Sequence, residues 1–121
     1  MKIKRIAFVG IPVTDMKRAR AFYEGVLGLK ATMESGEGSF VEYTTDEGTV
    51  SLGSMGDRWL PSEHGTCAAL EVENFDEAIT KLREASVPFT MDPYETPVCH
   101  MAMVQDPDGN KLMIHKLKAE D

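Results

Sequence analysis

The sequence is poor in several residue types that particular classes of protein require. It holds 13 lysines and arginines against 20 aspartates and glutamates, which gives a formal net charge of −7. A nucleic-acid-binding surface needs clustered positive charge, so this balance argues against a polynucleotide partner. No apolar run approaches the roughly 20 residues that cross a bilayer. Pro12 and Asp15 soon interrupt the apolar stretch near the N-terminus, so we expect neither a membrane span nor a secretory leader.

Cysteine is equally scarce. Cys67 and Cys99 are far apart and outside any CxxC spacing, which argues against a disulfide scaffold and predicts two reduced thiols in a cytoplasmic protein. What the 121 residues do hold is 42% hydrophobic and 27% charged side chains, a balance typical of one soluble globular domain. Methionine is unusually frequent, with eight copies. Its flexible, polarizable side chain suits both loosely packed cores and adaptable binding surfaces.

An internal repeat organises the chain. The segment FVGIPVTDMKRARAFYEGVL, from Phe8, aligns without gaps on CAALEVENFDEAITKLREAS, from Cys67, at an offset of 59 residues. Each copy opens with a strand-like apolar alternation and then turns helical after a residue that caps helices well, Asp15 in the first copy and Asn74 in the second. Gly28 follows the first helix where a C-terminal cap favours positive φ.

Three strands are predicted after each helix. A turn at Asp46-Glu47-Gly48 separates two of them, and Asp106-Pro107-Asp108-Gly109 has the Pro and Gly positions of a hairpin turn. Each half is therefore β-α-β-β-β, and we expect one domain over residues 1–121, made of two modules at about 4–54 and 66–118 with a linker at about 55–65. The expected strands after the helices cover 30–34, 39–45, 49–54, 88–91, 98–105 and 110–117.

The βαβββ repeat, the FYEGVLGL run on the first helix and the DPDGN turn before the last strand together resemble the vicinal oxygen chelate superfamily. Its members include glyoxalase I, extradiol dioxygenases, and the fosfomycin- and bleomycin-resistance proteins. The resemblance extends from about Ile6 to His115. It implies an α+β fold in which two βαβββ modules form a curled mixed sheet around a cup, usually in a homodimer. Because this fold hosts several chemistries and also pure binding, function has to be argued from individual residues.

The resemblance also implies where a metal would be held. In metal-dependent relatives the ligands come from the first strand of each module and from the last strand of one or both. Position by position, the two histidines fall on Phe8 and Cys67, and the glutamate falls on Met113. The register of the first module's last strand leaves three candidates, Leu52, Ser51 and Gly53.

These residues are poor ligands for the metals of the family. Octahedral divalent ions bind imidazole and carboxylate, whereas Phe and Leu offer no lone pair. Cys67 and Met113 are soft donors that could suit Cu(I), but two isolated donors are too few to support that site. We therefore predict neither a metal nor a cofactor, and expect Phe8, Cys67 and Met113 to line the cup.

Acid–base chemistry is the alternative that the sequence leaves open. His115 lies two residues beyond Met113 and should share its face of the last strand. His100 lies on the preceding strand, where the hairpin could bring it near Lys111 or Met113. A buried histidine beside a carboxylate can act as acid or base near neutral pH. The acidic candidates are Glu42 and Glu71.

Four further residues have two interpretations each. Trp59, in the linker, can stack on a planar ligand or cover the open edge of the cup. Met101 and Met103 alternate along a strand, which favours the core, and both are kept as candidate ligand contacts. Cys99 adjoins His100, but strand neighbours point to opposite faces, so a buried structural thiol is favoured over a nucleophile.

Three functions compete at this point. The favoured one is a metal-independent small-molecule-binding protein of the bleomycin-resistance type, cytoplasmic and homodimeric, whose apolar cup takes an aromatic or cationic compound. The second is a metal-independent lyase or isomerase that uses His100 or His115 with a carboxylate. The third is a glyoxalase-I-like or dioxygenase-like metalloenzyme with displaced ligands such as His100, His115 and Glu42. Whether the protein is an enzyme, and which compound it binds, stay open.

Overall fold

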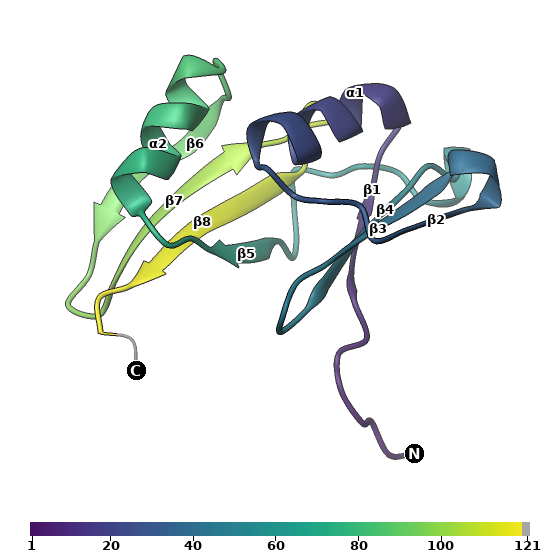
Figure 1. Cartoon of the computed structure of the whole chain (residues 1–121), viewed down its shortest axis with the longest axis horizontal. Helices are drawn as coiled ribbons and strands as arrows, with labels where there is room; N and C mark the ends of the chain where they lie inside the picture. The colour runs from purple at the N-terminus through teal and green to yellow at the C-terminus, as the bar shows by residue number, and fades with distance from the viewer. Residues whose placement is uncertain (120–121) are drawn as a thin grey trace. The chain divides into compact units, whose positions relative to one another are not determined.

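The same order of elements occurs twice along the computed structural model, which describes residues 1–119 (Figure 1). The chain divides into two compact units, Met1–Pro61 and a second that begins at Ser62. Each unit contains one strand, a helical segment and three further strands, and each builds a four-stranded mixed sheet. The predicted α+β fold of two βαβββ repeats is therefore confirmed.

In the first unit the strand order is β1-β4-β3-β2. β1 runs parallel to β4, whereas the β2–β3 and β3–β4 pairs are antiparallel. Parallel neighbours need a crossover connection, and here a short α-helix that continues as a π-helical segment provides it. The elements are β1 (Val9–Pro12), α1 (Met16–Arg20), the π-helical segment (Ala21–Val26), β2 (Met33–Ser35), β3 (Phe40–Thr44) and β4 (Thr49–Gly53).

The second unit repeats this topology with the order β5-β8-β7-β6. β5 is parallel to β8, and the remaining pairs are antiparallel. The crossover is a single α-helix of ten residues. The elements are β5 (Ala68–Glu71), α2 (Phe75–Glu84), β6 (Phe89–Glu95), β7 (Cys99–Gln105) and β8 (Lys111–Leu117).

Both helices begin where the sequence predicts. The Asp15 side chain accepts a hydrogen bond from the Arg18 N–H at 3.1 Å, and Asn74 accepts one from the Glu77 N–H at 3.0 Å. Each bond satisfies an N–H that the first helical turn leaves without a partner. After the first helix Gly28 has a φ of 78°, the left-handed conformation expected of a C-terminal cap.

The π-helical segment was not predicted. Its signature is the bond from the Leu27 N–H to the Phe22 carbonyl at 3.0 Å, which spans five residues instead of four. Phe22 and Tyr23 are consecutive and both buried, at 6% and 1% exposure. The widened turn thus coincides with the place where two neighbouring aromatic side chains enter the core.

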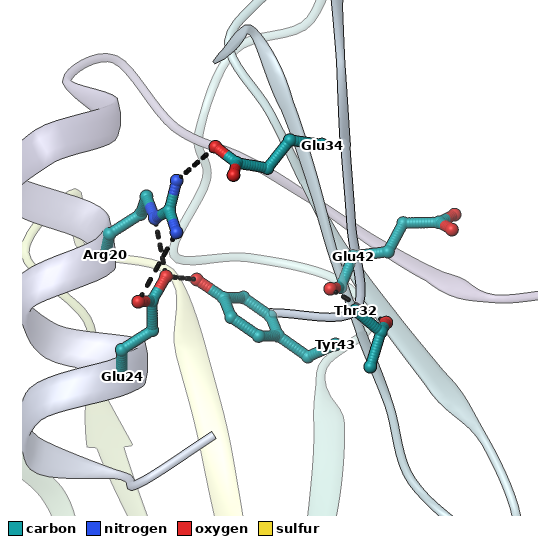
Figure 2. A network of polar contacts seen from close by, with 6 residues as sticks. All are labelled: Arg20, Glu24, Thr32, Glu34, Glu42 and Tyr43. Atoms are coloured by element: carbon teal, nitrogen blue, oxygen red, sulfur yellow. Dashed lines mark hydrogen bonds and ion pairs between the residues drawn. The ribbon is translucent and has the colours of Figure 1, made fainter. Parts of the chain in front are cut away.

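One face of each sheet packs against its helix and forms the core. In the first unit the Tyr23 and Tyr43 rings stack with centroids 6.3 Å apart. Figure 2 shows Tyr43 pointing from β3 towards the helix and Glu42 pointing away from it. In the second unit the fully buried side chains of β7 and β8 alternate with partly exposed ones. The buried residues on the helix side of these two strands are Ala102, Val104, Leu112 and Ile114, and Cys99 is also buried at the start of β7.

A polar network ties the first crossover helix to its sheet (Figure 2). Arg20 contacts Glu24 and Glu34, each at 2.5 Å, and the Tyr43 hydroxyl donates to Glu24 Oε2 at 2.8 Å. The hydrogen bond from Arg20 holds the pKa of the Glu24 carboxyl below its ordinary value. Burial, and then the bond to Glu24, raise the pKa of Tyr43. The network lies on the helix side of the sheet, so the opposite face is left for other roles.

Element boundaries differ from the predicted ones mainly in two strands. β2 begins at Met33 instead of residue 30 and ends at Ser35, where a 3₁₀ turn at Gly36–Gly38 follows. β6 continues to Glu95, and two register shifts interrupt its pairing with β7. Such bulges let an edge strand contain Pro93, which has no N–H for a regular ladder. Within residues 1–119 no helix is both long and apolar enough to cross a membrane.

Candidate functional sites on the helix-free sheet faces

The helix-free face of the first sheet carries three aromatic side chains over two glycines. A Cβ placed on Gly10 would lie 2.7 Å from Cη2 of Trp59, and one on Gly53 would lie 2.7 Å from Cζ3 of the same ring. The Phe40 ring would be 3.0 Å from the added atom on Gly53. Real Cβ contacts are not this short, so the indole lies against the sheet only because both positions lack a side chain. Phe8, beside Gly10, is 51% exposed. We call Phe8, Phe40 and Trp59 the aromatic face.

A serine and a glutamate lie among these rings. Ser51 pairs with Gly10 on one side and with Glu42 on the other, so the three residues form one row across the sheet. The next row brings together Gly53 and Phe40. Ser51 is only 4% exposed, and its hydroxyl donates to Glu42 Oε2 at 3.0 Å. The aromatic face therefore contains one carboxylate, oriented by a buried hydroxyl.

The helix-free face of the second sheet is rich in methionine. Met103 pairs with Met113, and the next pair of the same face joins Met101 to His115. All three methionines are partly exposed, so the preference for a core position of Met101 and Met103 is corrected. Strand alternation explains the outcome, because the core faces of β7 and β8 are filled by the intervening residues. We call Met101, Met103 and Met113 the methionine face.

His115 forms a close pair with a carboxylate on this second sheet. Its Nδ1 lies 2.6 Å from Glu71 Oε1, and the Leu117 N–H donates to Glu71 Oε2 at 2.8 Å. Partial burial works to raise the pKa of Glu71, but the hydrogen bonds from His115 and Leu117 outweigh it, so the pKa is lowered. The carboxylate orients the imidazole and leaves Nε2 as the ring nitrogen for a ligand. Glu71, rather than Glu42, is the carboxylate that the structure brings to His115.

His100 does not lie near Lys111 or Met113, which corrects its expected position. It pairs with Lys116, and its ring packs 5.4 Å from the ring of Phe75 on α2. The register of the hairpin determines this position, because residues at equal distances from the turn pair with each other. His100 is an odd number of residues from Met101 and Met103, so its side chain lies on the opposite face of β7. His100 and His115 thus point to opposite faces of one sheet. A metal site built on both histidines is not supported, whereas a separate catalytic role of either stays a prediction.

Strand register resolves the last position of the inferred metal site. Met113 pairs with Ala69, and Ser51 pairs with Gly10, which is 59 residues before Ala69. Ser51 is therefore the equivalent of Met113, whereas Leu52 is fully buried on the helix side. The four positions thus hold Phe8, Cys67, Met113 and Ser51. This donor set does not fit an octahedral divalent ion. Residues 1–119 contain no group of three or more His, Cys, Asp or Glu side chains placed to hold a metal.

The two cysteines lie in different environments. Cys99 is buried, and its sulfur lies 3.2 Å from the Thr96 hydroxyl, consistent with a structural thiol. Cys67 is exposed just before β5. Both are free thiols in the structure. His100 therefore cannot act as a base that activates the Cys99 thiol, since its ring lies on the other side of the strand.

The sequence did not predict that Phe40 and Ser51 lie on the same face of the first sheet as Trp59. Phe40 is not among the predicted site residues, and Ser51 is predicted only as one of three possible metal positions. The signal available in the sequence is a pair of glycines in two predicted strands, Gly10 and Gly53, together with a linker that holds the only tryptophan. Two such gaps in neighbouring strands indicate that a large ring packs on them.

A model of the Glyoxalase/Bleomycin resistance protein/Dioxygenase superfamily matches residues 5–114. The chain belongs to this superfamily. The match covers nearly the whole chain, so the resemblance inferred from the repeat and the DPDGN turn is confirmed. A search among curated proteins finds no significant match.

Solved structures show the same fold at low sequence identity. One is TnmS3, an antibiotic binding protein from Streptomyces sp. CB03234, with a TM-score of 0.78 and 22% identity over 98% of this chain and 99% of that one. A superfamily member from Sphaerobacter thermophilus DSM 20745 has a TM-score of 0.78 and 27% identity over 94% and 98% of the two chains. Lactoylglutathione lyase from Agrobacterium tumefaciens has a TM-score of 0.71 and 19% identity over 95% of each. Binding proteins and enzymes thus share this architecture.

Proposed function

We propose that the protein is a metal-independent small-molecule-binding member of its superfamily. The observation that carries the proposal is the aromatic face, where Trp59 lies on two glycines beside Phe40 and the 51% exposed Phe8. Exposed aromatic rings held on a rigid sheet offer a large contact area at little entropic cost. Such a surface suits a flat, largely apolar compound.

The residues at the family's metal positions support a binding role. Phe8 has no lone pair, Met113 has only a thioether, and Ser51 already donates its hydroxyl proton to Glu42. A chain with this donor set binds its ligand through apolar surface and a few polar groups, as small-molecule sites commonly do. The likeness to an antibiotic binding protein is consistent with this proposal.

The methionine face is a second surface for ligand contact. Thioethers are polarizable and adapt their rotamers to irregular shapes, so a methionine surface tolerates varied ligands. Cys67, exposed just before the second unit's first strand, joins this set on the family resemblance alone. The proposed ligand contacts are therefore Phe8, Trp59, Cys67, Met101, Met103 and Met113.

A ligand screen tests the binding function. Native mass spectrometry and thermal-shift assays of chelator-treated protein are run against a panel of aromatic and cationic compounds. Binding raises the melting temperature by mass action, and the fluorescence of Trp59, the sole tryptophan, reports contact with the aromatic face. Phe8→Ala should weaken each hit that changes Trp59 fluorescence, whereas Val98→Ala, at an exposed apolar position of the second unit, should not. A panel without any hit would contradict the binding function, and hits that change Trp59 fluorescence but are insensitive to Phe8 would contradict the aromatic face as the binding surface.

The His115–Glu71 pair favours a second candidate function, a metal-independent lyase or isomerase. With Nδ1 held by Glu71 at 2.6 Å, Nε2 of His115 can remove a proton from carbon next to a carbonyl and return it. In deuterated water this reaction exchanges the carbon-bound hydrogen, which NMR detects in a panel of small carbonyl compounds. Exchange that disappears in His115→Gln while the fold is retained supports catalysis. Exchange no faster than in buffer argues against it.

We also propose a cytoplasmic homodimer. Near the N-terminus, Ile3 and Ile6 are more than two-thirds exposed, and apolar side chains of this kind favour burial against a partner. The two free thiols are consistent with a reducing compartment. Light scattering coupled to size exclusion should give twice the chain mass, and Ile3→Asp with Ile6→Asp should shift the protein to monomer. A monomeric wild type would refute the assembly.

A further inference from the structure

We propose that the aromatic face selects planar cations, with Glu42 as the group that recognises the positive charge. The inference rests on the proposed binding function and adds to it the chemical class of the ligand. It follows from three features of the first unit: the position of the carboxylate among the rings, the hydrogen bond that orients it, and the absence of a cationic partner for it within residues 1–119.

Strand register places the carboxylate within reach of a stacked ligand. Glu42 and Phe40 lie two residues apart on one face of β3, and Ser51 separates Glu42 from Gly10, one of the two glycines beneath Trp59. Neighbouring strands are about 4.8 Å apart, and next-nearest residues on one strand about 7 Å apart. A ring stacked on Phe40 or Trp59 therefore lies within a side-chain length of the Glu42 carboxylate.

The carboxylate is held in place without being neutralised. Ser51, 4% exposed, donates to Oε2 of Glu42 at 3.0 Å, which uses one lone pair and leaves the negative charge intact. Three other glutamates do have a cationic partner, since Glu24 and Glu34 contact Arg20, and Glu95 contacts Lys118. Among residues 1–119, neither lysine nor arginine lies within ion-pair distance of Glu42.

Two attractions then act on the same ligand. The faces of aromatic rings are electron-rich and attract a cation, and Trp provides the strongest such surface. The Glu42 charge adds a Coulomb attraction that a neutral ligand lacks and that repels an anion. The chemistry that fits this surface is a flat aromatic ring with a delocalised or quaternary positive charge.

Three probes with the same skeleton of two fused six-membered rings separate charge recognition from stacking. N-methylquinolinium is the cation, quinoline at mildly alkaline pH is the neutral compound, and naphthoate is the anion. Each is titrated into nitrogen-15-labelled protein, and the indole N–H signal of Trp59, which arises from the sole tryptophan, gives the dissociation constant. The variant is Glu42→Gln, and the control is Glu47→Gln, which removes the same charge at an exposed turn position.

The expected order of affinity is cation, then neutral compound, then anion. Glu42→Gln should weaken the cation about twofold to fivefold, the range for a partly exposed charge contact, and should leave quinoline unchanged. Glu47→Gln should change neither. Equal affinity for cation and neutral compound, or an equal loss in both variants, would overturn the cation selectivity while leaving the binding function intact. No shift of the Trp59 signal with any probe would overturn both.

Discussion

Replacing Gly53 by alanine should displace Trp59 while the fold persists. Gly53 is not among the glycines with positive φ, so the backbone accepts alanine without strain. The new methyl carbon, however, would lie 2.7 Å from Cζ3 and 3.2 Å from Cε3 of Trp59, and 3.0 Å from Cε1 of Phe40. Carbon atoms pack at about 3.5 to 4.0 Å, so both rings must retreat, the indole by about 0.8 Å or more.

The opposing free-energy terms nearly cancel. Overpacking of a tight site costs about 1 to 3 kcal/mol, and the lower end applies because Trp59 is partly exposed and can move outward. Alanine in place of glycine restricts the unfolded chain and returns about 0.4 to 1 kcal/mol. The free energy of unfolding should therefore fall by about 1 kcal/mol or less, whereas the aromatic face loses its geometry.

The assay combines thermal unfolding with two signals of the indole. Gly53→Ala should lower the melting temperature by only about 4 °C, shift Trp59 emission to longer wavelength and reduce the near-UV circular dichroism. Gly48→Ala is the matched control, because its added Cβ meets nothing within 4 Å. The control should leave both Trp59 signals unchanged. Wild-type emission and dichroism in Gly53→Ala would refute the claim that the glycines seat the indole.

The remaining predictions concern stability. Tyr43→Phe removes the hydroxyl that donates to Glu24 and should lower the free energy of unfolding in urea by about 1 to 2 kcal/mol; an unchanged midpoint would contradict this. Because the bond from Arg20 lowers the pKa of Glu24 from 4.5, the stabilisation is present above that value and is lost as pH falls through the lowered pKa. Acid titration of Glu24→Gln should therefore show a weaker loss of stability than wild type, and parallel curves would argue otherwise. Asn74→Ala removes the cap on the Glu77 N–H, so thermal unfolding should report a loss of about 1 kcal/mol that Asn74→Asp largely restores.

Local signals in the sequence predict the fold well. Asp15 and Asn74 cap helices through their own side chains, and the Asp106–Gly109 turn determines the position of a hairpin. Each of these features depends on only three or four consecutive residues, so the local sequence is enough to predict it. The repeat then places these signals in the same order twice. Strand ends are less predictable, because bulges such as those of β6 depend on the partner strand.

The candidate sites depend on pairing between distant segments. His115 contacts Glu71 because β5 and β8 pair in parallel, although the two residues are 44 apart in sequence. The Trp59 ring, from the loop after β4, packs on Gly10 of β1. No local pattern encodes either contact. The predicted position of His100 was wrong because the hairpin register decides which face of the sheet a side chain occupies. A shift of one residue along the strand moves the side chain to the opposite face.

Metal-independent binding at the aromatic face is tested most directly by calorimetry of one aromatic ligand under three conditions. The dissociation constant of N-methylquinolinium is measured with protein as purified, after exhaustive treatment with EDTA, and after addition of Ni²⁺, Mn²⁺ or Zn²⁺. The donor set of Phe8, Ser51, Cys67 and Met113 predicts the same dissociation constant in all three. Binding that is lost with EDTA and restored by one of the ions would contradict the account.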